Sequence, residues 1–273
     1  MRAHQRVTQA GPGNQQVREY LELRRSRGGR SPTRAAIEGL GLIDAALTHG
    51  ATIEVALACP ALLRGTRADG VVARLAAAGV PMLQVSKRTF ERLTARDGPD
   101  GLAAIVRVRT VPLHEVAVGG VARALVLDRF EHPGNVGSLI RCAGAVGATA
   151  VIVTDQLVRL NHPLVVKASA GAIFSVAVTS ARAEDALVWL RAHAFQVVAA
   201  DPAASRSYRS ARYGPRVAVV LGSERHGLAT VWRNGADELL AIPMAGRVDS
   251  LNAGHAGALF LYEVAHRHRV QGA

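Results

Sequence analysis

The chain has 273 residues, of which 49% are hydrophobic, and its formal net charge is +12 at pH 7. A chain of this size can bury one or two hydrophobic cores. The longest apolar runs, such as residues 217–221 (VAVVL), are strand length and far shorter than the about 20 residues that span a bilayer. With a polar, charged stretch after Met1, the composition predicts a cytoplasmic protein with no membrane segment and no secretory signal.

The cysteine content and the charge limit the kinds of partner. Cys59 and Cys142 are the two cysteines, and both lie in apolar surroundings. This disfavours a disulfide framework and leaves too few ligands for a zinc cluster, so no metal site is expected. The excess of bases over acids favours a polyanionic partner, with nucleic acid first among the candidates. Genome composition can explain the preference for Arg over Lys, but not that excess.

The N-terminal part predicts a basic segment and a small domain. Residues 1–30 are polar and rich in Gly and Arg, and we expect them to be partly flexible. Residues 31–111 alternate helical and strand patterns and predict a small α/β domain, followed by a linker at 112–121. The expected helices cover 35–47 and 71–78, and the expected strands cover 53–57, 82–85 and 101–108.

The C-terminal part, residues 122–273, predicts a second and larger domain. Apolar strands alternate here with helices, which is typical of a mostly parallel sheet covered on both faces. The expected strands cover 124–127, 150–153, 173–178, 196–199 and 217–221, and the expected helices cover 136–146, 183–192 and 253–268. The predicted fold class is therefore α/β.

Three polar clusters interrupt this second domain. Each stands where an apolar strand ends and a Gly-rich turn or a helix begins, which is where open α/β sheets bind ligands. We therefore expect the clusters to form one site. They span residues 135–141 (NVGSLIR), 222–224 (GSE) and 242–252 (IPMAGRVDSLN).

Arg141 is the least expected residue in these clusters, because it stands inside an otherwise small and apolar helical segment. Its helical neighbours three and four residues away are Gly137, Ser138, Gly144 and Ala145. Small neighbours leave space for a ligand to approach the guanidinium, whose rigid and permanently charged donors suit a phosphate or ribose oxygen. A solvated arginine is the alternative.

The other polar residues also have plain structural explanations. Asn135 and Asn252 are each well placed to cap a helix. Glu224 stands between glycines in what can be an ordinary surface loop. No Gly-x-Gly-x-x-Gly dinucleotide fingerprint follows a predicted strand, so a nicotinamide oxidoreductase is disfavoured.

Taken together, the three clusters resemble the motifs of the SpoU (TrmH-like) family of RNA 2′-O-ribose methyltransferases, in the same order. The resemblance covers roughly residues 122–267. It implies a SPOUT-type catalytic domain with a trefoil knot, S-adenosyl-L-methionine as the cofactor, and a homodimer. Shorter stretches at 36–43 and 99–106 are similar to the small substrate-binding domain that many family members carry in front of the catalytic domain.

The resemblance also implies roles for individual residues of an RNA (ribose-2′-O)-methyltransferase. Because an arginine is effectively always protonated, we expect Arg141 to grip a phosphate and stabilise developing alkoxide charge rather than act as a base. This chain has Ala253-Gly254 where the family more often has Val-Ser. The implied catalytic residues are Asn135, Arg141, Glu224, Ser250 and Asn252. The implied cofactor-binding residues are Leu221, Gly222, Ile242, Met244 and Leu251.

Basic residues outside these clusters are expected to contact RNA. The candidates are Arg24, Arg25, Arg27, Arg30 and Lys167. A second group, Arg206, Arg209, Arg212 and Arg216, is interleaved with Tyr208 and Tyr213, a pattern that fits base stacking combined with phosphate contact. Solvated charge is the alternative for any single arginine.

The two-domain form favours ribosomal RNA, above all 23S rRNA, over tRNA as the substrate. Some related enzymes confer resistance to ribosome-targeting antibiotics through this reaction. The alternatives are a tRNA 2′-O-methyltransferase, a noncatalytic RNA-binding protein of the same fold, and a related knotted enzyme that methylates a base.

Overall fold

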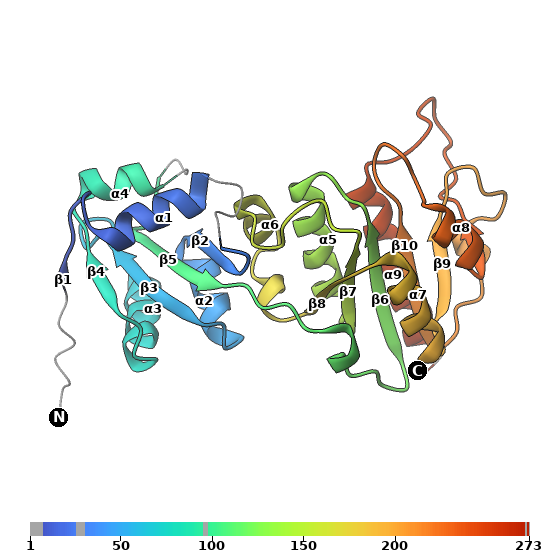
Figure 1. The fold of residues 1–273 in the computed structure, drawn as a ribbon, viewed down its shortest axis with the longest axis horizontal. Helices are drawn as coiled ribbons and strands as arrows, with labels where there is room; N and C mark the ends of the chain where they lie inside the picture. Colours follow the sequence, from blue (N-terminus) through green and yellow to red (C-terminus); the bar gives the residue numbers. More distant parts are fainter. Residues whose placement is uncertain (1–7, 26–30, 95–97, 271, 273) are drawn as a thin grey trace. The chain divides into compact units, whose positions relative to one another are not determined.

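The structure is a computed structural model that describes residues 8–25, 31–94, 98–270 and 272. The chain gathers into two compact units (Figure 1). The first unit takes in residues up to 109 and a later segment, 159–174, and the second unit takes in 110–158 and 175–273. Each unit has a sheet and a hydrophobic core of its own.

The first unit has a mixed sheet with the strand order β1-β4-β3-β5-β2. Strands β1, β4 and β3 are parallel, and β5 is antiparallel to both β3 and β2. The strands are β1 (Thr8–Gln9), β2 (Arg34–Glu38), β3 (Ile53–Ala58), β4 (Met82–Gln84) and β5 (Leu102–Arg107). The three short strands predicted in this region are confirmed as β3, β4 and β5.

Helices cover both faces of this sheet (Figure 1). Buried residues of α1 and α4 share one core with the sheet, and α2 packs on α3 across the other face. The helices are α1 (Gln15–Arg25), α2 (Leu40–Thr48), α3 (Thr66–Ala77) and α4 (Lys87–Leu93). The predicted helix at 71–78 is confirmed as the larger part of α3.

The helix predicted over 35–47 is wrong in its first part. Residues 34–38 pair with β5 as strand β2, and α2 begins only at Leu40. Gly39 separates the two at φ 100°, a conformation that favours glycine. Three consecutive residues of β2 are buried, so their apolar character reflects burial on both faces of a strand rather than a helical period.

Part of the N-terminal segment forms a helix that the sequence analysis did not predict. Val17, Tyr20 and Leu23 recur every three residues, and all three are buried in the core of the first unit. Asn14 caps the helix, because its Oδ1 accepts a hydrogen bond from the backbone N–H of Gln16 at 2.9 Å. Residues 15–25 of this segment, which was expected to be partly flexible, are therefore helical, while residues 1–7 and 26–30 lie outside the described residues.

Residues 159–174 complete the first unit, although they stand between two strands of the second unit in the sequence. The segment contains α6 (Pro163–Ala168) and a short 3-10 helix, η2 (Ala172–Phe174). The side chain of Asn161 is buried and donates from Nδ2 to the carbonyls of Ser31 at 2.9 Å and Arg34 at 2.8 Å. These bonds attach the segment to the start of β2.

The same segment accounts for one wrong strand prediction and for a difference from the predicted domains. The strand predicted over 173–178 is instead β8 (Ala177–Ala181), and Ile173 is buried within η2. The predicted domain 122–273 ran through this segment, whose helices α6 and η2 contact β2 and α2 of the first unit. Gly171, at φ 96°, packs so closely on Ala45 that an added Cβ would lie 2.4 Å from the Cβ of Ala45.

The described residues of the second unit form a six-stranded sheet in the order β11-β9-β10-β6-β7-β8, and every neighbouring pair is parallel. The strands are β6 (Ala122–Asp128), β7 (Ala150–Thr154), β8, β9 (Gln196–Ala200), β10 (Arg216–Leu221) and β11 (Glu238–Leu240). The near-continuous apolar runs of β6 and β10 are buried, as in parallel sheets covered on both faces. The α/β class is confirmed, and the trefoil knot stays a prediction.

Two pairs of helices cover this sheet (Figure 1). On one face, Trp189, Leu190 and Trp232 of α7 and α8 pack into the core. On the other face, α9 contacts α5 and the central strands β10 and β6. The helices are α5 (Pro133–Ala145), α7 (Ala183–Ala192), α8 (Thr230–Gly235) and α9 (Ala253–Val270).

The predicted linker, residues 112–121, packs against the second unit. It contains a short 3-10 helix, η1 (Leu113–Glu115), and Val116, which is buried in the core beneath α7. Just before it, the N–H of Val111 donates to the carbonyl of Val178 on β8 at 2.9 Å. The segment therefore extends the second unit.

Candidate active site

The parallel sheet of the second unit brings the three polar clusters to one edge. Strands β6, β10 and β11 end at Asp128, Leu221 and Leu240, and the carboxyl ends of parallel strands lie on the same side of a sheet. The loops that follow them span residues 129–132, 222–229 and 241–252. Each loop holds, or leads directly into, one of the clusters.

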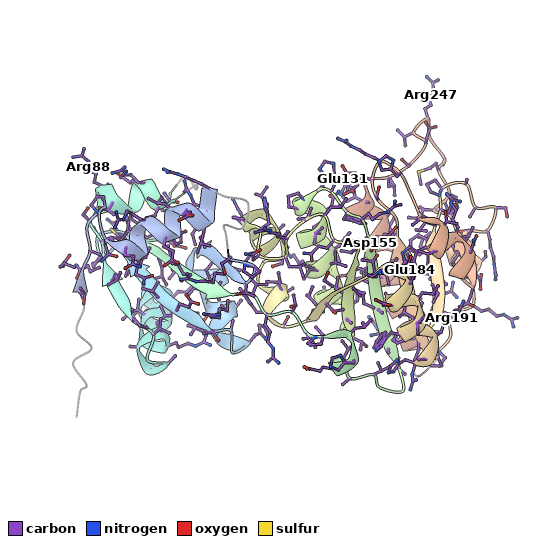
Figure 2. All side chains as sticks on the ribbon, viewed as in Figure 1. Arg88, Glu131, Asp155, Glu184, Arg191 and Arg247 are labelled. Carbon is purple, nitrogen blue, oxygen red and sulfur yellow. The ribbon has the colours of Figure 1, made fainter. Side chains whose placement is uncertain are left out.

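Glu224 joins the first two clusters. Its Oε1 accepts a hydrogen bond from Nδ2 of Asn135 at 2.9 Å, and its Oε2 accepts one from the backbone N–H of Glu131 at 3.2 Å. The carboxylate therefore binds both the loop after β6 and the first turn of α5. Figure 2 shows Glu131 beside the start of α5.

Asn135 does not cap this helix, so the prediction from sequence that it would act as an N-cap is wrong. Helix α5 begins earlier, with His132 as its N-cap residue and Pro133 in the first turn, a position that proline favours. Asn135 thus lies inside the first turn, and its side chain is directed to Glu224.

The loop that carries Glu224 is a tight turn. Ser223 and Gly227 exchange two backbone hydrogen bonds, at 2.9 and 3.0 Å, and Oγ of Ser223 accepts a third from the N–H of His226 at 3.0 Å. At Gly222 the backbone approaches so closely that an added Cβ would lie 2.3 Å from the carbonyl carbon of Gly227. Only glycine fits at position 222, and the turn holds Glu224 in place.

Asp128 also holds these loops together, and it was not among the predicted site residues. Its side chain is fully buried; Oδ1 accepts from the hydroxyl of Thr154 at 3.0 Å, and Oδ2 accepts from the N–H of Ala229 at 3.3 Å. This carboxylate ties together the ends of β6 and β7 and the loop after β10. A charged residue ending a buried apolar strand was the available signal.

The start of α9 brings in the third cluster. Oδ1 of Asn252 accepts from the N–H of Gly254 at 2.8 Å, so Asn252 caps α9 as predicted. A Cβ added at Gly254 would lie 3.0 Å from Oδ1 of Asn252, 3.2 Å from Oγ of Ser138 and 3.6 Å from Oδ1 of Asn135. Residues of the first and third clusters therefore meet at Gly254. Ser138 and Gly254 were not among the predicted site residues.

Arg141 and Ser250 are the two predicted catalytic residues whose side chains form no hydrogen bond within the described part of the chain. Arg141 is exposed on α5, one turn after Ser138 and on the same face, and it makes no hydrogen bond or ion pair with any described residue. Ser250 is exposed in the loop between β11 and α9 and likewise has no hydrogen bond to a described residue. Both side chains are free to meet a ligand.

The predicted cofactor residues differ in how accessible they are. The side chain of Leu221 is buried, and an added Cβ at Gly257 of α9 would lie 2.5 Å from its Cδ1, so only its backbone can face a ligand. Ile242 and Met244 are half-buried, and Leu251 is 37% exposed, all in the loop between β11 and α9. Arg247 lies at the outer tip of this loop (Figure 2).

The residues predicted to contact RNA separate into several groups. Arg25 and Lys167 are exposed, whereas Nη1 of Arg24 donates to the carbonyl of Leu93 at 2.7 Å. Arg27 and Arg30 lie outside the described residues. Lys167 belongs to α6 and hence to the first unit.

The second basic group does not present the predicted stacking surface. Tyr208 and Tyr213 are 5% and 3% exposed, so neither ring is open to a base, and the prediction is wrong for both. They are buried because the Tyr208 ring packs on Phe260 of α9, and the Tyr213 hydroxyl donates to the carbonyl of Tyr208 at 2.6 Å. Arg206 pairs with Glu238, and Arg216 donates to the carbonyls of Gly119 and His193.

No group of three or more His, Cys, Asp or Glu side chains among the described residues is placed to hold a metal ion. No helix in the described parts of the chain combines the length and the apolar character needed to cross a membrane.

Comparison with known proteins gives two family matches. The profile of the SpoU rRNA Methylase family matches residues 122–262, and that of the MRM3-like substrate binding domain matches residues 14–104. Among curated proteins, a Streptomyces viridochromogenes protein named 23S rRNA (uridine(2479)-2′-O)-methyltransferase is 30% identical over 64% of this chain and 63% of its own length. The chain spans less than two thirds of the length of the first curated relatives it matches.

Solved structures match over nearly the whole chain. An AdoMet-bound rRNA methyltransferase from Sinorhizobium meliloti is 30% identical, with a TM-score of 0.85 over 96% of this chain and 98% of that one. A structure described as an RNA 2′-O ribose methyltransferase is 33% identical, with a TM-score of 0.82 over 96% of this chain and 99% of that one.

Proposed function

The chain belongs to the SpoU rRNA methylase family, and from this premise we propose that it transfers a methyl group from S-adenosyl-L-methionine to a ribose 2′-hydroxyl of RNA. The convergence of Asn135, Glu224 and Asn252 carries this proposal. These residues come from segments far apart in the chain: Glu224 accepts a hydrogen bond from Asn135, and the side chains of Asn135 and Asn252 both lie beside Gly254. The names of the aligned relatives support the same activity.

The loops at this edge of the sheet fit the proposed cofactor. Ile242 and Met244 are half-buried and Leu251 is partly exposed, so together they offer apolar surface to an adenosine. The turn at Gly222, whose backbone packs closely on Gly227, would present main-chain groups to the same ligand. When bound, S-adenosyl-L-methionine supplies an electrophilic methyl group on a sulfonium.

The side chains of this site would align the acceptor hydroxyl. Arg141, exposed and without a partner among the described residues, would bind the phosphate next to the target ribose and stabilise negative charge on the 2′-oxygen. Glu224 holds Asn135 in the first turn of α5, and Asn252 holds the start of α9. An in-line transfer depends mainly on such positioning.

For the substrate, we favour ribosomal RNA, above all 23S rRNA. The match of the first unit to a substrate-binding domain and the net charge of +12 support an RNA partner. Methylation of ribosomal RNA would place the protein in the cytoplasm, and methylation next to a drug site on the ribosome would confer antibiotic resistance. A tRNA substrate is the alternative within the same chemistry.

We also propose a homodimer. Val248 in the loop before α9 and Leu259 on α9 are 62% and 39% exposed, and a subunit interface would cover such apolar side chains. Sedimentation equilibrium of the full chain tests this, since a species of single-chain mass at micromolar concentration would contradict it.

The activity is tested by mapping alkali-resistant linkages in RNA from cells with and without the protein. A 2′-O-methyl group blocks alkaline cleavage at one linkage, so the expected result is one or a few resistant positions that need the protein. A methylated base that leaves its linkage cleavable would indicate the base-methylating alternative. Absence of S-adenosyl-L-methionine binding by calorimetry would indicate a noncatalytic RNA-binding protein.

A further inference from the structure

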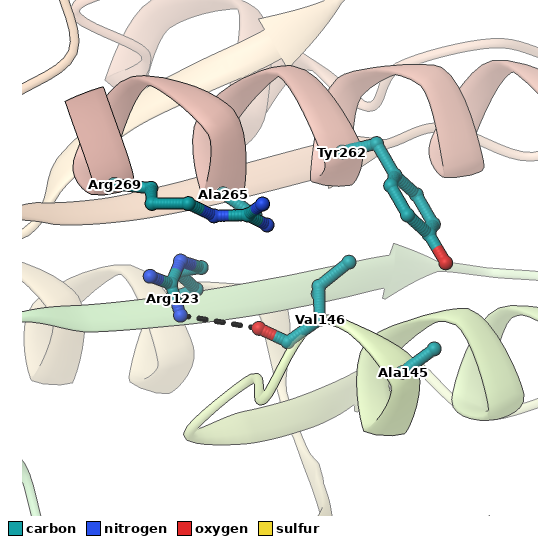
Figure 3. A pocket seen from close by; sticks show the side chains of 6 residues that line it. All are labelled: Arg123, Ala145, Val146, Tyr262, Ala265 and Arg269. Carbon is teal, nitrogen blue, oxygen red and sulfur yellow. Dashed lines mark hydrogen bonds between the residues drawn. The ribbon is translucent and has the colours of Figure 1, made fainter.

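A hollow of about 240 Å³ lies in the second unit between the C-terminal ends of α5 and α9 (Figure 3). It is lined by Arg123, Ala145, Val146, Tyr262, Ala265 and Arg269. Arg123 stands at the beginning of β6, whereas the candidate active site lies beyond the end of that strand at Asp128. The five steps from Arg123 to Asp128 along the strand span about 17 Å, so the two arginines of the hollow lie away from the loops of the candidate active site, and Ala145 stands one turn after Arg141 on α5.

Two arginines, Arg123 and Arg269, make the hollow positively charged. Nη1 of Arg123 donates to the carbonyl of Val146 at 3.1 Å, but its Nε is buried and has no partner among the described residues. Neither Arg123 nor Arg269 pairs with a carboxylate in the described part of the chain, whereas Arg267, two residues earlier on α9, is paired with Glu263. Burial and the nearby charge of Arg269 lower the pKa of Arg123.

Helix ends explain part of this arrangement. A cation near the C-terminus of a helix is favourable, and Arg123 and Arg269 stand at the C-terminal ends of α5 and α9. This explains the bond to Val146, but it leaves a buried N–H without an acceptor and two like charges close together. An oxyanion between the two guanidiniums would relieve both costs.

The walls of the hollow indicate what kind of oxyanion it accepts. The Tyr262 ring is 56% exposed at one end, and the side chains of Ala145, Val146 and Ala265 add small apolar surfaces (Figure 3). Arginine forks suit phosphate, and a tyrosine ring suits a base or ribose. We propose that this hollow binds the phosphate group of a nucleotide, with the adjoining base or ribose against Tyr262.

The phosphate has two sources, the backbone of an RNA and a free nucleotide. An RNA source rests on the proposed function and would make the hollow a contact for a nucleotide other than the one that is methylated. The binding of the phosphate group itself depends on no residue of the candidate active site.

The test is calorimetry on the full chain with three probes: inorganic phosphate, uridine 5′-monophosphate and a short single-stranded RNA. Arg269→Gln should weaken phosphate and nucleotide binding by at least about tenfold, because it removes a charged donor. Tyr262→Ala should weaken nucleotide binding but leave phosphate binding unchanged. Arg182→Gln is the matched control: it removes the same charge from an arginine that is 77% exposed at the start of α7, and it should have no effect.

The outcomes separate the two sources and the proposed function. Competition between RNA and the nucleotide, lost in Arg269→Gln, supports the RNA source, and nucleotide binding without such competition supports the free nucleotide. Equal effects of Arg269→Gln and Arg182→Gln, or no binding of phosphate and nucleotide, would overturn the proposal. The proposal would also be overturned if Arg269→Gln made a dimer dissociate while neither phosphate nor uridine 5′-monophosphate bound. The hollow would then belong to a subunit interface. Methyl-donor affinity, measured in parallel, should be unchanged in Arg269→Gln whichever result is found.

Discussion

Glu224 accepts a hydrogen bond from Asn135 at 2.9 Å, although 89 positions separate the two residues in the chain. The second carboxylate oxygen of Glu224 accepts the N–H of Glu131, so one side chain fixes the loop after β10 against the start of α5. The relative position of these two loops therefore depends on a single carboxylate and the amide that faces it.

Asn135→Ala should lower kcat/KM for methyl transfer by about tenfold or more. It removes a hydrogen bond to a charged group, worth about 1.5–3 kcal/mol, from a half-buried pair that positions the loop. Asn135→Asp should be worse, because it places a second carboxylate against Glu224. Steady-state kinetics with a saturating methyl donor measure both effects, and wild-type kinetics in Asn135→Asp would show that the pair has no positioning role.

Arg141→Ala should reduce kcat by about 10²–10³, the usual loss when a donor to developing negative charge is removed. Calorimetry should find the affinity for S-adenosyl-L-methionine nearly unchanged, because Arg141 is exposed and bonds to no described residue. Arg141→Lys keeps the charge but lacks the planar guanidinium, so its kcat should lie between those of the wild type and Arg141→Ala. If the affinity for S-adenosyl-L-methionine fell in proportion to kcat, Arg141 would be assigned to cofactor binding rather than to substrate binding.

Gly222→Ala should impair both donor binding and turnover. A Cβ at this position would lie 2.3–2.4 Å from backbone atoms of Gly227 and Leu228, so the turn that carries Glu224 must move. The expected loss of stability is about 1–3 kcal/mol, measured by thermal unfolding. Gly246→Ala is the control in the neighbouring loop, since an added Cβ there meets nothing within 4 Å. An unchanged Gly222→Ala protein would mean that the turn is not needed in its present form.

His268 should make stability depend on pH. It is buried near the end of α9, its Nε2 contacts the carbonyl of Gly214 at 2.7 Å, and its Nδ1 has no partner among the described residues. Burial lowers its pKa despite the bond to Gly214, and the charge of Arg123 lowers it further. A lowered pKa means that the unfolded chain binds more protons between the folded value and about 6.5.

Stability should therefore rise with pH through this window and fall as pH drops below about 6.5. His268→Gln can still donate to Gly214 but does not titrate, so its melting temperature should change less between about pH 5 and pH 8. His266→Gln, an exposed residue on the same helix, should keep the wild-type slope. Identical slopes for both variants would assign the pH dependence to other groups.

Much of the second unit could be predicted from the sequence, because its strands are buried on both faces and appear as unbroken apolar runs. The same burial misled the prediction at β2, where consecutive apolar residues were interpreted as a helix. Helix α1 was missed because Val17, Tyr20 and Leu23 are spread through a polar segment.

The candidate site could be predicted in part. Asn135, Glu224 and Asn252 stood out through their spacing and their resemblance to family motifs, and the structure brings the first two into direct contact. Ser138 and Gly254 could not be identified, because their importance arises only where distant segments approach one another. The burial of Tyr208 and Tyr213 could not be predicted for the same reason. The helix that covers Tyr208 begins 45 residues later in the chain.

Residues 159–174 have a practical consequence for dissecting this protein into fragments. The chain passes from one unit to the other after residues 109, 158 and 174, so no single cut separates the units. A fragment starting at residue 110 would expose Val165 and Val166, which are fully buried in the intact chain, and a fragment ending at 109 would lose the amide that secures Ser31 and Arg34. An isolated second unit therefore requires a short turn in place of residues 159–174, and an isolated first unit requires that segment to stay attached to it.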